Sequence, residues 1–596
     1  MSTYVAPLKD MRFVLNELAG LAEVAKLPGY EEASPDTVDA ILEEAAKFAS
    51  EVLDPLNRVG DQEGSRWKDG VVTTPKGFKE AYRKYVEGGW GALPFGPEWG
   101  GQGLPKLVAT VVEEMLTSSN MSFSLCPLLT QGAIHALELC GADALKQAFL
   151  PKMTQGSWTG TMNLTEPQAG SDLALVKTRA RREGDHYRIT GQKIFITYGE
   201  HDMAENIVHL VLARLPGAPG GTRGISCFIV PKFLVNKDGS LGPHNDLRCV
   251  SIEEKLGIHG SPTCVMSFGD QGGATGFLIG EENKGMRSMF TMMNNARLSV
   301  GLQGLAIAER AYQQAVAFAR ERKQGTPPRG GANATIVEHP DVRRMLLTMR
   351  SQIEAMRGLI YLNAESIDRA HHHPDAAERA KAQALVELLT PVSKGWSTDL
   401  GVELTSIGVQ VHGGMGFIEE TGAAQHFRDS RIAPIYEGTN GIQALDLVMR
   451  KLPLEGGETV KRFIGQMKAI DGALGAAKEP GFTAMRGNLK SGVAALETAT
   501  EWLARTMAAD PAAAAAGATP YLRMFGIVAG GYLLAKGALA AAKLRAAGQD
   551  AAFHDAKIAT ARFYAEQVLP QAAALAGPVM AGTEAIYAIP AELLSA

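Results

Sequence analysis

The chain has 596 residues, of which 45% are apolar and 21% charged, and this composition is typical of a globular protein with roughly three or four domains. Its 59 lysines and arginines and its 64 aspartates and glutamates give a net charge of −5 without a basic block, so a nucleic-acid partner is not expected. Five cysteines without a C-x-x-C pair predict reduced thiols, and they predict neither a disulfide framework nor a metal site.

The N-terminal part is predicted to be helical. Its first residues, MSTYVAPLKDMRFVLNELAGL, carry charges at Lys9, Asp10 and Arg12 before any long apolar run, so they do not resemble a signal peptide, and we expect a cytoplasmic protein. From residue 35 onward apolar residues recur at helical spacing, after the start signal Ser34-Pro35-Asp36. We predict an N-terminal helical domain over residues 1–157.

The texture of the sequence changes at residue 158 and changes back near residue 281. Short runs dense in Val, Ile, Thr and aromatics, such as HYRITGQKIFITYG and GISCFIV, predict a barrel-like middle β domain over residues 158–280. Helical periodicity then returns and predicts a helical bundle over residues 281–455. An Ala-rich segment predicts an additional C-terminal helical domain over residues 456–596. The expected fold class is therefore mainly α with a β insert.

One apolar stretch, MFGIVAGGYLLA at residues 524–535, raises the question of a membrane span. It lies between Arg523 and Lys536, and its uncharged length falls short of the about 20 residues that a bilayer requires. We expect no transmembrane segment. The sequence instead predicts a packed helix with Gly526, Gly530 and Gly531 at close contacts.

Two segments of the predicted β domain could bind a cofactor. In TMNLTEPQAGSD (161–172), Gly170 and Ser171 follow Pro167 in a turn whose backbone N–H groups could hold an anionic or carbonyl-rich group, although a simple β-turn explains the same residues. In QKIFITYG (192–199), Phe195 and Thr197 share one face of a strand and could pack on and hydrogen-bond a flat heterocycle. A core phenylalanine beside a solvated threonine is the alternative.

A glycine cluster in IGVQVHGGMGF (407–417) follows a helical pattern. Gly413 and Gly414, with Gln410, permit close backbone approach to a phosphate or a ring, but a helix C-cap and turn require the same glycines. No strand precedes the cluster, so a βαβ dinucleotide fingerprint is not present. Arg297 and Arg322 occur in helical segments, where they could clamp phosphate or lie along apolar surface in a salt bridge.

Glu437 stands between an apolar run and a tight turn in IAPIYEGTNGIQ (432–443). The run that ends at Tyr436 would exclude water and raise the pKa of Glu437 toward the range useful for a general base, whereas the dipole of a following helix opposes this effect. Gly438 permits the turn, and Thr439 is expected to cap that helix. A solvated turn residue is the alternative interpretation.

Seven segments, in this order, resemble the acyl-CoA dehydrogenase family of flavoproteins, and the resemblance extends over residues 35–455. They are PEWGGQG (97–103), NLTEPQAGSD (163–172), GQKIFITYG (191–199), AR (296–297), ERKQ (321–324), QVHGGMGF (410–417) and YEGTNGIQ (436–443). The extended N-terminus and the extra C-terminal segment resemble the longer bacterial subgroup of that family.

The resemblance implies that FAD is bound without a Rossmann fold. The implied contacts within one subunit are Leu164, Thr165, Gly170, Ser171, Phe195, Thr197 and Thr439. Most family members have Trp where Phe195 stands. The resemblance also implies that Arg322, Gln324, Gln410, Gly413 and Gly414 reach the FAD of a neighbouring subunit, and hence that the protein is a homodimer or a dimer of dimers.

The implied reaction is α,β-dehydrogenation of an acyl-CoA thioester to the trans-2-enoyl-CoA. Glu437 would take the α proton, flavin N5 would accept the hydride, and electron-transfer flavoprotein would receive the electrons. The implied substrate contacts are Ser171, Asn294, Arg297 and Gly438. Some branches of the family carry the base on the helix near residue 295, where this chain has Asn295 and Ala296.

Two other functions remain open in the sequence. An acyl-CoA oxidase would differ in the access of oxygen to the reduced flavin. A flavin-containing protein that binds or protects nucleic acid would need a basic patch in residues 456–596, where Lys and Arg are instead dispersed among Asp and Glu. The acyl group is not defined, because Met289, Met292 and Met293 could form either an adaptable pocket wall or ordinary core.

Overall fold

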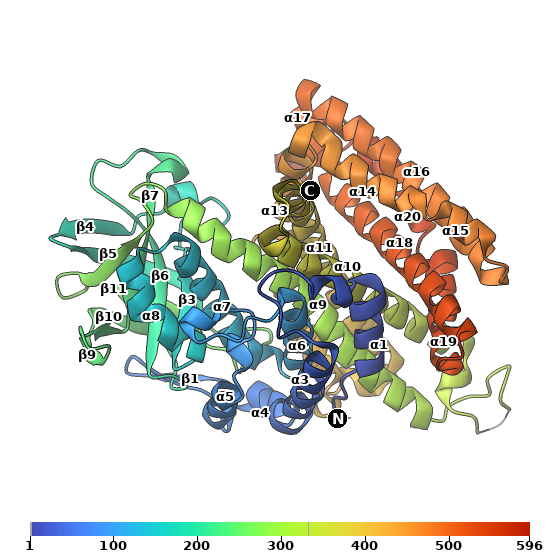
Figure 1. The fold of residues 1–596 in the computed structure, drawn as a ribbon, viewed down its shortest axis with the longest axis horizontal. Coiled ribbons are helices and arrows are strands. Elements are labelled where there is room, and N and C mark those ends of the chain that lie inside the picture. Colours follow the sequence, from blue (N-terminus) through green and yellow to red (C-terminus); the bar gives the residue numbers. More distant parts are fainter. Residues whose placement is uncertain (1–2, 332, 596) are drawn as a thin grey trace. The chain divides into compact units, whose positions relative to one another are not determined.

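The computed structural model describes residues 3–331 and 333–595, which form two compact units (Figure 1). The first, here called the sheet unit, contains Thr3–Ala6 and Asp39–Ser299. The second, here called the bundle unit, contains Pro7–Val38 and the described residues from Val300 onward. Helices predominate and one segment is a sheet, so the predicted fold class is confirmed.

Helix α3 begins where the local start signal predicted. Helix α3 starts at Pro35, and the hydroxyl of Ser34 accepts a 3.2 Å hydrogen bond from the backbone N–H of Thr37, as an N-cap does. The side chain of Asn120 caps α7 in the same way, through the N–H of Phe123. The helices of this region are α3 (Pro35–Phe48), α4 (Asp54–Glu63), α5 (Phe78–Glu87), α6 (Lys106–Ser119), α7 (Met121–Cys140) and α8 (Asp143–Gln155).

The main sheet of the sheet unit has eight strands. Their order is β10-β11-β5-β12-β7-β6-β3, with β4 paired to β5 and β6. Pairing is antiparallel except for β3 with β6 and a single contact of β4 with β6. Its strands are β3 (Trp158–Asn163), β4 (Arg179–Glu183), β5 (His186–Thr197), β6 (Asn206–Arg214), β7 (Ile225–Pro231), β10 (Leu247–Ile252), β11 (Thr263–Phe268) and β12 (Ala274–Ile279). Two short hairpins are β1 (Arg66–Lys68) with β2 (Val71–Thr73), and β8 (Phe233–Val235) with β9 (Leu241–His244).

Helix α7 packs closely against strand β3. A Cβ atom at Gly160 would lie only 2.5 Å from the Cβ of Ala133, so the strand needs glycine where the helix crosses it. Buried Leu137, Phe149 and Trp158 continue this core. Met289 and Met292 are fully buried in the same cluster, so these two members of the methionine stripe are core residues.

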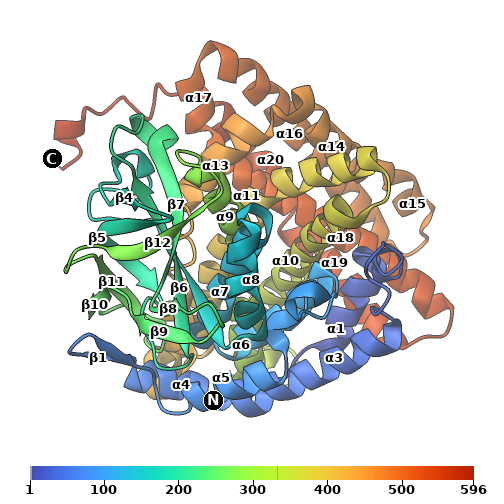
Figure 2. The same cartoon turned by 60° about the vertical axis from the view of Figure 1, so that its left-hand side comes forward.

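The bundle unit contains long helices. Those up to residue 446 are α1 (Leu8–Phe13), α2 (Leu21–Val24), α9 (Gly285–Glu321), which begins in the sheet unit, α10 (Pro340–His372), α11 (Ala376–Val411), α12 (Ala423–Ser430) and α13 (Asn440–Asp446). The later ones are α14 (Glu458–Ala469), α15 (Asp471–Ala476), α16 (Pro480–Ala509), α17 (Pro511–Ala516), α18 (Ala518–Ala546), α19 (Ala551–Gln567), α20 (Gln571–Ala574) and α21 (Ala576–Met580). Figures 1 and 2 show α16, α18 and α19 side by side.

Helix α18 is a core helix of the bundle unit. By length and composition it is the one helix among the described residues that could cross a membrane, but 83% of its most apolar window is buried inside the protein. A Cβ at Gly526 would lie 2.2 Å from the ring of Trp396, and one at Gly530 or Gly531 would meet Tyr564 or Leu569 within 3 Å. The predicted close contacts of these three glycines are confirmed.

A buried cluster of charges connects α1, α10 and α19. The Nζ of Lys557 lies 2.5 Å from Oδ1 of Asp10 and 2.7 Å from Oε2 of Glu354. Arg357 contacts Asp10 and lies 2.9 Å from Glu309. Burial alone would raise the pKa of Asp10, but Lys557 and Arg357 lower that pKa to about 2, so the carboxyl is ionised at neutral pH.

Candidate active site

Strand β5 contains a bulge at Phe195. Lys193 pairs with Met266 and Ile196 with Cys264, so two residues of β5 oppose the single residue Val265 of β11. Phe195 adopts the left-handed conformation, with φ of 59°, which costs a non-glycine residue on the order of 1–2 kcal/mol. The bulge turns the phenyl ring outward, where 59% of the residue's surface is exposed.

Thr197 lies on the same outward side of β5 as Phe195, because Ile196 between them is buried. The predicted shared face is therefore confirmed. The strict alternation assumed for it is interrupted, since the buried positions shift from odd to even residue numbers at the bulge. A bare aromatic ring beside a hydroxyl is the surface that a flat heterocycle would cover.

The segment 163–172 is held against this bulge by two consecutive residues of β5, Lys193 and Ile194. Lys193 Nζ donates to the carbonyl of Leu164 at 3.0 Å, and the N–H of Ile194, which the bulge leaves out of the ladder, donates to the carbonyl of Thr165 at 2.9 Å. Glu166 then accepts a 2.8 Å hydrogen bond from Lys193 Nζ. These bonds hold the backbone of Thr165 next to the bulge that contains Phe195.

Glu166 is the polar centre of this segment. Its carboxylate also accepts hydrogen bonds from the backbone N–H groups of Lys177 and Thr178 and from the Thr178 hydroxyl. Burial opposes ionisation of Glu166, but the bonds and the charge of Lys193 lower its pKa to about 2. Burial lowers the pKa of Lys193 to about 8, against the pull of Glu166. We conclude that the pair is ionised at neutral pH.

The remaining predicted residues of the segment differ in exposure. Leu164 is buried and Thr165 half-buried, while Gly170 and Ser171 lie exposed in the bend after the Glu166–Ala169 turn. The Asp172 carboxylate accepts a 2.9 Å bond from the N–H of Ala174. Asp172 thus makes a local bond to backbone, as polar turn residues do, and Gly170 and Ser171 remain exposed beside it.

The first turns of α9 carry the predicted substrate contacts Asn294 and Arg297. Asn294 is exposed and Arg297 is buried, and Arg297 Nη1 lies 3.5 Å from Oδ1 of Asn294. Two residues further, Ser299 donates a 3.2 Å hydrogen bond to Glu113 on α6. The intervening Asn295 is half-buried and Ala296 buried, so this stretch supplies no carboxylate.

In the bundle unit, Glu437 and Gly438 both have left-handed backbone, with φ of 57° and 86°. Glycine adopts this conformation freely, but a glutamate does so only when its surroundings hold it there. Thr439 caps α13 by accepting a 3.3 Å bond from the N–H of Ile442, as predicted. Glu437 is half-buried, and its carbonyl accepts a 3.3 Å bond from Gln443.

The apolar run before Glu437 ends in a buried tyrosine hydroxyl. Tyr436 donates a hydrogen bond to Oε1 of Gln303 on α9. Burial raises the pKa of Tyr436 well above its usual value, and the nearby Glu437 carboxylate raises it further. The Tyr436 hydroxyl is therefore neutral, and it donates its hydrogen bond to Gln303.

The turn at Glu437 accepts a hydrogen bond from a buried lysine of α11 that was not identified from the sequence. Lys394 is fully inaccessible, and its Nζ donates to the carbonyl of Gly438 at 2.8 Å and to Oδ1 of Asn440 at 2.9 Å. Lys193 was missed in the same way. Lys193 follows Gln192 and Lys394 follows Ser393, so in the sequence each lysine stands beside another polar residue and no local signal marks it as buried.

The five residues expected to reach a neighbouring subunit are all exposed. The rings of Phe318 and His412 are in tilted contact, with centroids 4.5 Å apart, which brings the end of α9, before Arg322, to the turn at Gly413. Next to them Phe417 is 86% exposed. The exposed members are Arg322, Gln324, Gln410, Gly413 and Gly414.

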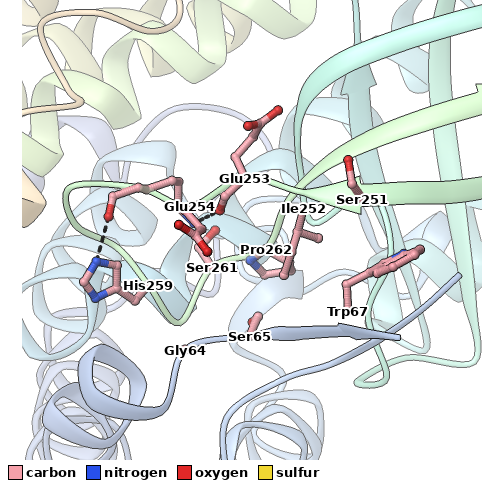
Figure 3. Close-up of a pocket in the computed structure, with 11 residues that line it drawn as sticks. Gly64, Ser65, Trp67, Ser251, Ile252, Glu253, Glu254, His259, Ser261 and Pro262 are labelled. Atoms are coloured by element: carbon pink, nitrogen blue, oxygen red, sulfur yellow. Dashed lines mark hydrogen bonds between the residues drawn. The ribbon is translucent and has the colours of Figure 1, made fainter. Parts of the chain in front are cut away.

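A separate pocket of about 450 Å³ lies in the sheet unit, between the β1 hairpin and the β10–β11 connection. Figure 3 shows the indole of Trp67 at one end of it and the imidazole of His259 at the other. Glu253, Glu254 and Ser261 also line it. None of the site residues predicted from the sequence lies in its wall.

Four family models match the chain in succession. They describe the acyl-CoA dehydrogenase N-terminal domain at residues 35–157, the middle domain at 161–271 and the C-terminal domain at 283–452. The fourth, described as acetyl-CoA dehydrogenase C-terminal like, matches residues 459–590.

Individual relatives match over nearly their full length. The 3-methylmercaptopropionyl-CoA dehydrogenase of Ruegeria pomeroyi is 49% identical over 577 residues, which cover 96% of this chain and 97% of the relative. A butyryl-CoA dehydrogenase of Syntrophomonas wolfei is 37% identical over 590 residues, 95% of each chain. The solved structure of an acyl-CoA dehydrogenase from Bacillus anthracis, complexed with FAD, shares the fold at 20% identity, with a TM-score of 0.74 over 92% of this chain and 88% of that one.

Proposed function

This chain belongs to the acyl-CoA dehydrogenase family, and from that premise we propose that Glu437 is the base that removes the α proton of an acyl-CoA thioester. The observation that carries the proposal is the left-handed backbone of Glu437, followed by the left-handed Gly438. A glutamate in a strained conformation, held by its neighbours, is a frequent device of active sites. The product would be the trans-2-enoyl-CoA.

The residues at the bulge fit FAD, the cofactor of this family. The exposed ring of Phe195 offers a flat apolar surface, and Thr197 offers a hydroxyl on the same side. Leu164, Thr165, Gly170 and Ser171 would contribute backbone groups from the segment that Lys193 and Glu166 hold in place, and Thr439 would contribute from its turn. When bound, FAD supplies a hydride acceptor for the β carbon.

The chain's own groups would prepare the substrate for proton transfer. An α C–H is a weak acid in water, so the thioester carbonyl has to be polarised by hydrogen bonds as the proton leaves. We propose that the backbone N–H of Glu437 donates one of them. Asn294, Arg297, Ser171 and Gly438 would contact the acyl-CoA, with Arg297 suited to the anionic part of CoA.

The proposals for the electron acceptor and the assembly rest on the same family membership. We propose electron-transfer flavoprotein as the acceptor and a homodimer as the smallest complete form. The exposed residues Arg322, Gln324, Gln410, Gly413 and Gly414 support the dimer, because they form a surface on which a second subunit's FAD could rest. A mass measurement in solution by light scattering tests it, and a monomeric active enzyme would contradict it.

The decisive experiment compares two glutamates. Glu437→Gln removes the proton acceptor while keeping shape and hydrogen bonding, and it should lower the rate of acyl-CoA dehydrogenation by about 10²–10⁴-fold. Glu455→Gln is the matched control, because Glu455 is also a left-handed glutamate of the bundle unit but is exposed elsewhere. Full activity of Glu437→Gln would refute the role of Glu437.

The assay is anaerobic bleaching of the flavin by a panel of acyl-CoA thioesters. The panel should vary chain length and branching and should include a thioether acyl group, because the Ruegeria relative is named for one. The thioester that bleaches the flavin fastest identifies the substrate class. Rapid peroxide formation in air, without another acceptor, would instead identify an acyl-CoA oxidase.

A further inference from the structure

Lys394 is a buried cation in contact with the turn that carries Glu437. It lies on α11, is fully excluded from solvent, and bonds the Gly438 carbonyl at 2.8 Å and Asn440 Oδ1 at 2.9 Å. Taking a charge out of water is costly, and hydrogen bonds to the protein offset that cost only in part. A lysine here is therefore a poor way to gain stability, which points to another use for its charge.

Asn440 connects Lys394 to a second group on α11. Its Nδ2 donates to Oδ1 of Asp399 at 2.7 Å and to the carbonyl of Gly395 at 3.0 Å. Burial raises the pKa of Asp399 above its usual value, and the bond from Asn440 and the charge of Lys394 offset only part of that increase. Both the amide nitrogen and the amide oxygen of Asn440 are therefore hydrogen-bonded. Because its Oδ1 accepts from Lys394, the fixed position of Asn440 also orients the lysine.

We propose that Lys394 is a positioning residue for Glu437, an inference that rests on the proposed role of Glu437 as the base. Two consecutive left-handed residues form a turn that the backbone does not favour by itself. A charge-assisted hydrogen bond to the Gly438 carbonyl fixes the orientation of the peptide group after Gly438. The direction of the Glu437 carboxylate, and of its backbone N–H, follows from that orientation.

The rival interpretation gives Lys394 a purely structural role, as a link between α11 and α13. Both interpretations predict that removal of the lysine lowers thermal stability. They differ in what happens at the substrate, because a misplaced base slows proton transfer even in fully folded protein that binds the thioester normally. The test must therefore isolate proton transfer from stability, from binding and from hydride transfer.

The experiment uses the FAD-loaded enzyme and the CoA thioester of 3,3-dimethylbutanoic acid, which has α hydrogens but no β hydrogen. No hydride can leave this probe, so exchange of its α hydrogens with D₂O, followed by mass spectrometry, reports the base alone. Lys394→Met keeps the length of the side chain and removes the charge. We expect exchange to slow by about 10- to 100-fold, with little change in the Kd of the probe.

Arg523→Met is the matched control. Arg523 lies 2.6 Å from Glu403 of α11, and its charge also acts on Asp399, but its hydrogen bonds go to Glu403 and not to the 437–440 turn. Exchange in this variant should stay at the wild-type rate. Wild-type exchange in folded Lys394→Met would overturn the proposal and leave Lys394 a structural residue.

Glu437→Gln, measured in parallel, separates the two proposals. It should abolish exchange, and if it does not, the proposed role of Glu437 fails whatever Lys394 does. If Lys394→Met does not fold, Asn440→Ser provides the second test, because it removes one hydrogen-bond acceptor of Lys394 without changing α11. Slow exchange in Asn440→Ser supports the positioning role, and wild-type exchange overturns it.

Discussion

Lys193 on β5 donates a 2.8 Å hydrogen bond to Oε1 of Glu166, and neither side chain is accessible to solvent. The two residues are 27 positions apart in the chain, so the pair ties the segment 163–172 to the bulged strand. An ion pair in this location holds the backbone of Leu164 and Thr165, which the proposed cofactor would contact, more than it stabilises the fold.

Glu166→Gln should destabilise the sheet unit and weaken FAD retention, because it leaves the charge of Lys193 buried without its carboxylate. Breaking one partner of a buried pair costs about 3–5 kcal/mol. The free energy of unfolding from urea titration and the FAD content of purified protein measure the two effects. The double variant Glu166→Gln with Lys193→Met should regain part of the stability, and equal losses in both variants would contradict the pairing.

Phe195→Ala should reduce FAD binding while leaving stability nearly unchanged, because the ring is largely exposed and packs little. The adjacent Ile196→Ala is the matched control. Ile196 is buried, and its truncation should cost about 2–4 kcal/mol of unfolding free energy through lost packing. FAD affinity by fluorescence titration and urea unfolding should therefore separate the two variants. Unchanged FAD affinity in Phe195→Ala would argue against the ring as the flavin surface.

Gly438→Ala should lower kcat by about 10- to 100-fold, since φ of 86° strains an alanine and the relaxed turn would carry Glu437 with it. Gly441→Ala, three residues on, is the control. Gly441 lies in α13 outside the left-handed region, and the nearest atom to an added Cβ is 3.9 Å away. It should keep activity and gain up to about 1 kcal/mol of helix stability. Steady-state kinetics and thermal unfolding provide both measurements.

Acid should destabilise the sheet unit through two buried histidines. Burial, with a contribution from Lys232, lowers the pKa of His201 and of His209 from 6.5 to about 3. Below pH 6.5 the unfolded imidazoles take up protons that the folded ones do not, so the free energy of unfolding falls as the pH drops from 6.5 toward 3. Each histidine should contribute a loss of about 2 kcal/mol by pH 5.

Urea unfolding between pH 7.5 and pH 5 measures this loss. His209 accepts from or donates to the Thr161 hydroxyl at 2.7 Å, so His209→Asn keeps a polar partner for Thr161 while removing the titrating ring. The pH dependence should be shallower in that variant. A slope equal to that of the wild type would show that His209 is not one of the titrating groups.

Local signals in the sequence predicted much of this fold. Two of these features, the start of α3 at Pro35 and the cap of α13 at Thr439, depend on residues within a few positions. The close contacts of the α18 glycines depend on the absence of a side chain at those positions. Such features are readable because their physical cause is local.

The features that orient the candidate site were not predicted, because their causes lie far along the chain. The bulge at Phe195 depends on pairing with β11, where Val265 opposes two residues. Lys394 meets Asn440 across 46 positions. A periodic sequence pattern predicts whether a segment is a strand or a helix, but it does not predict which residues of two distant segments lie opposite each other.

The charge cluster around Asp10 has a consequence for how this protein is made. Asp10 lies on α1, whereas Lys557, one of the two cations that compensate it, follows 547 positions later in the sequence. At a synthesis rate of about 5–20 residues per second, Asp10 waits on the order of half a minute to two minutes for Lys557. The bundle unit therefore completes its charge cluster only after α19 has been translated, so a nascent chain stalled before α19 would lack one of the two cations that Asp10 contacts in the folded protein.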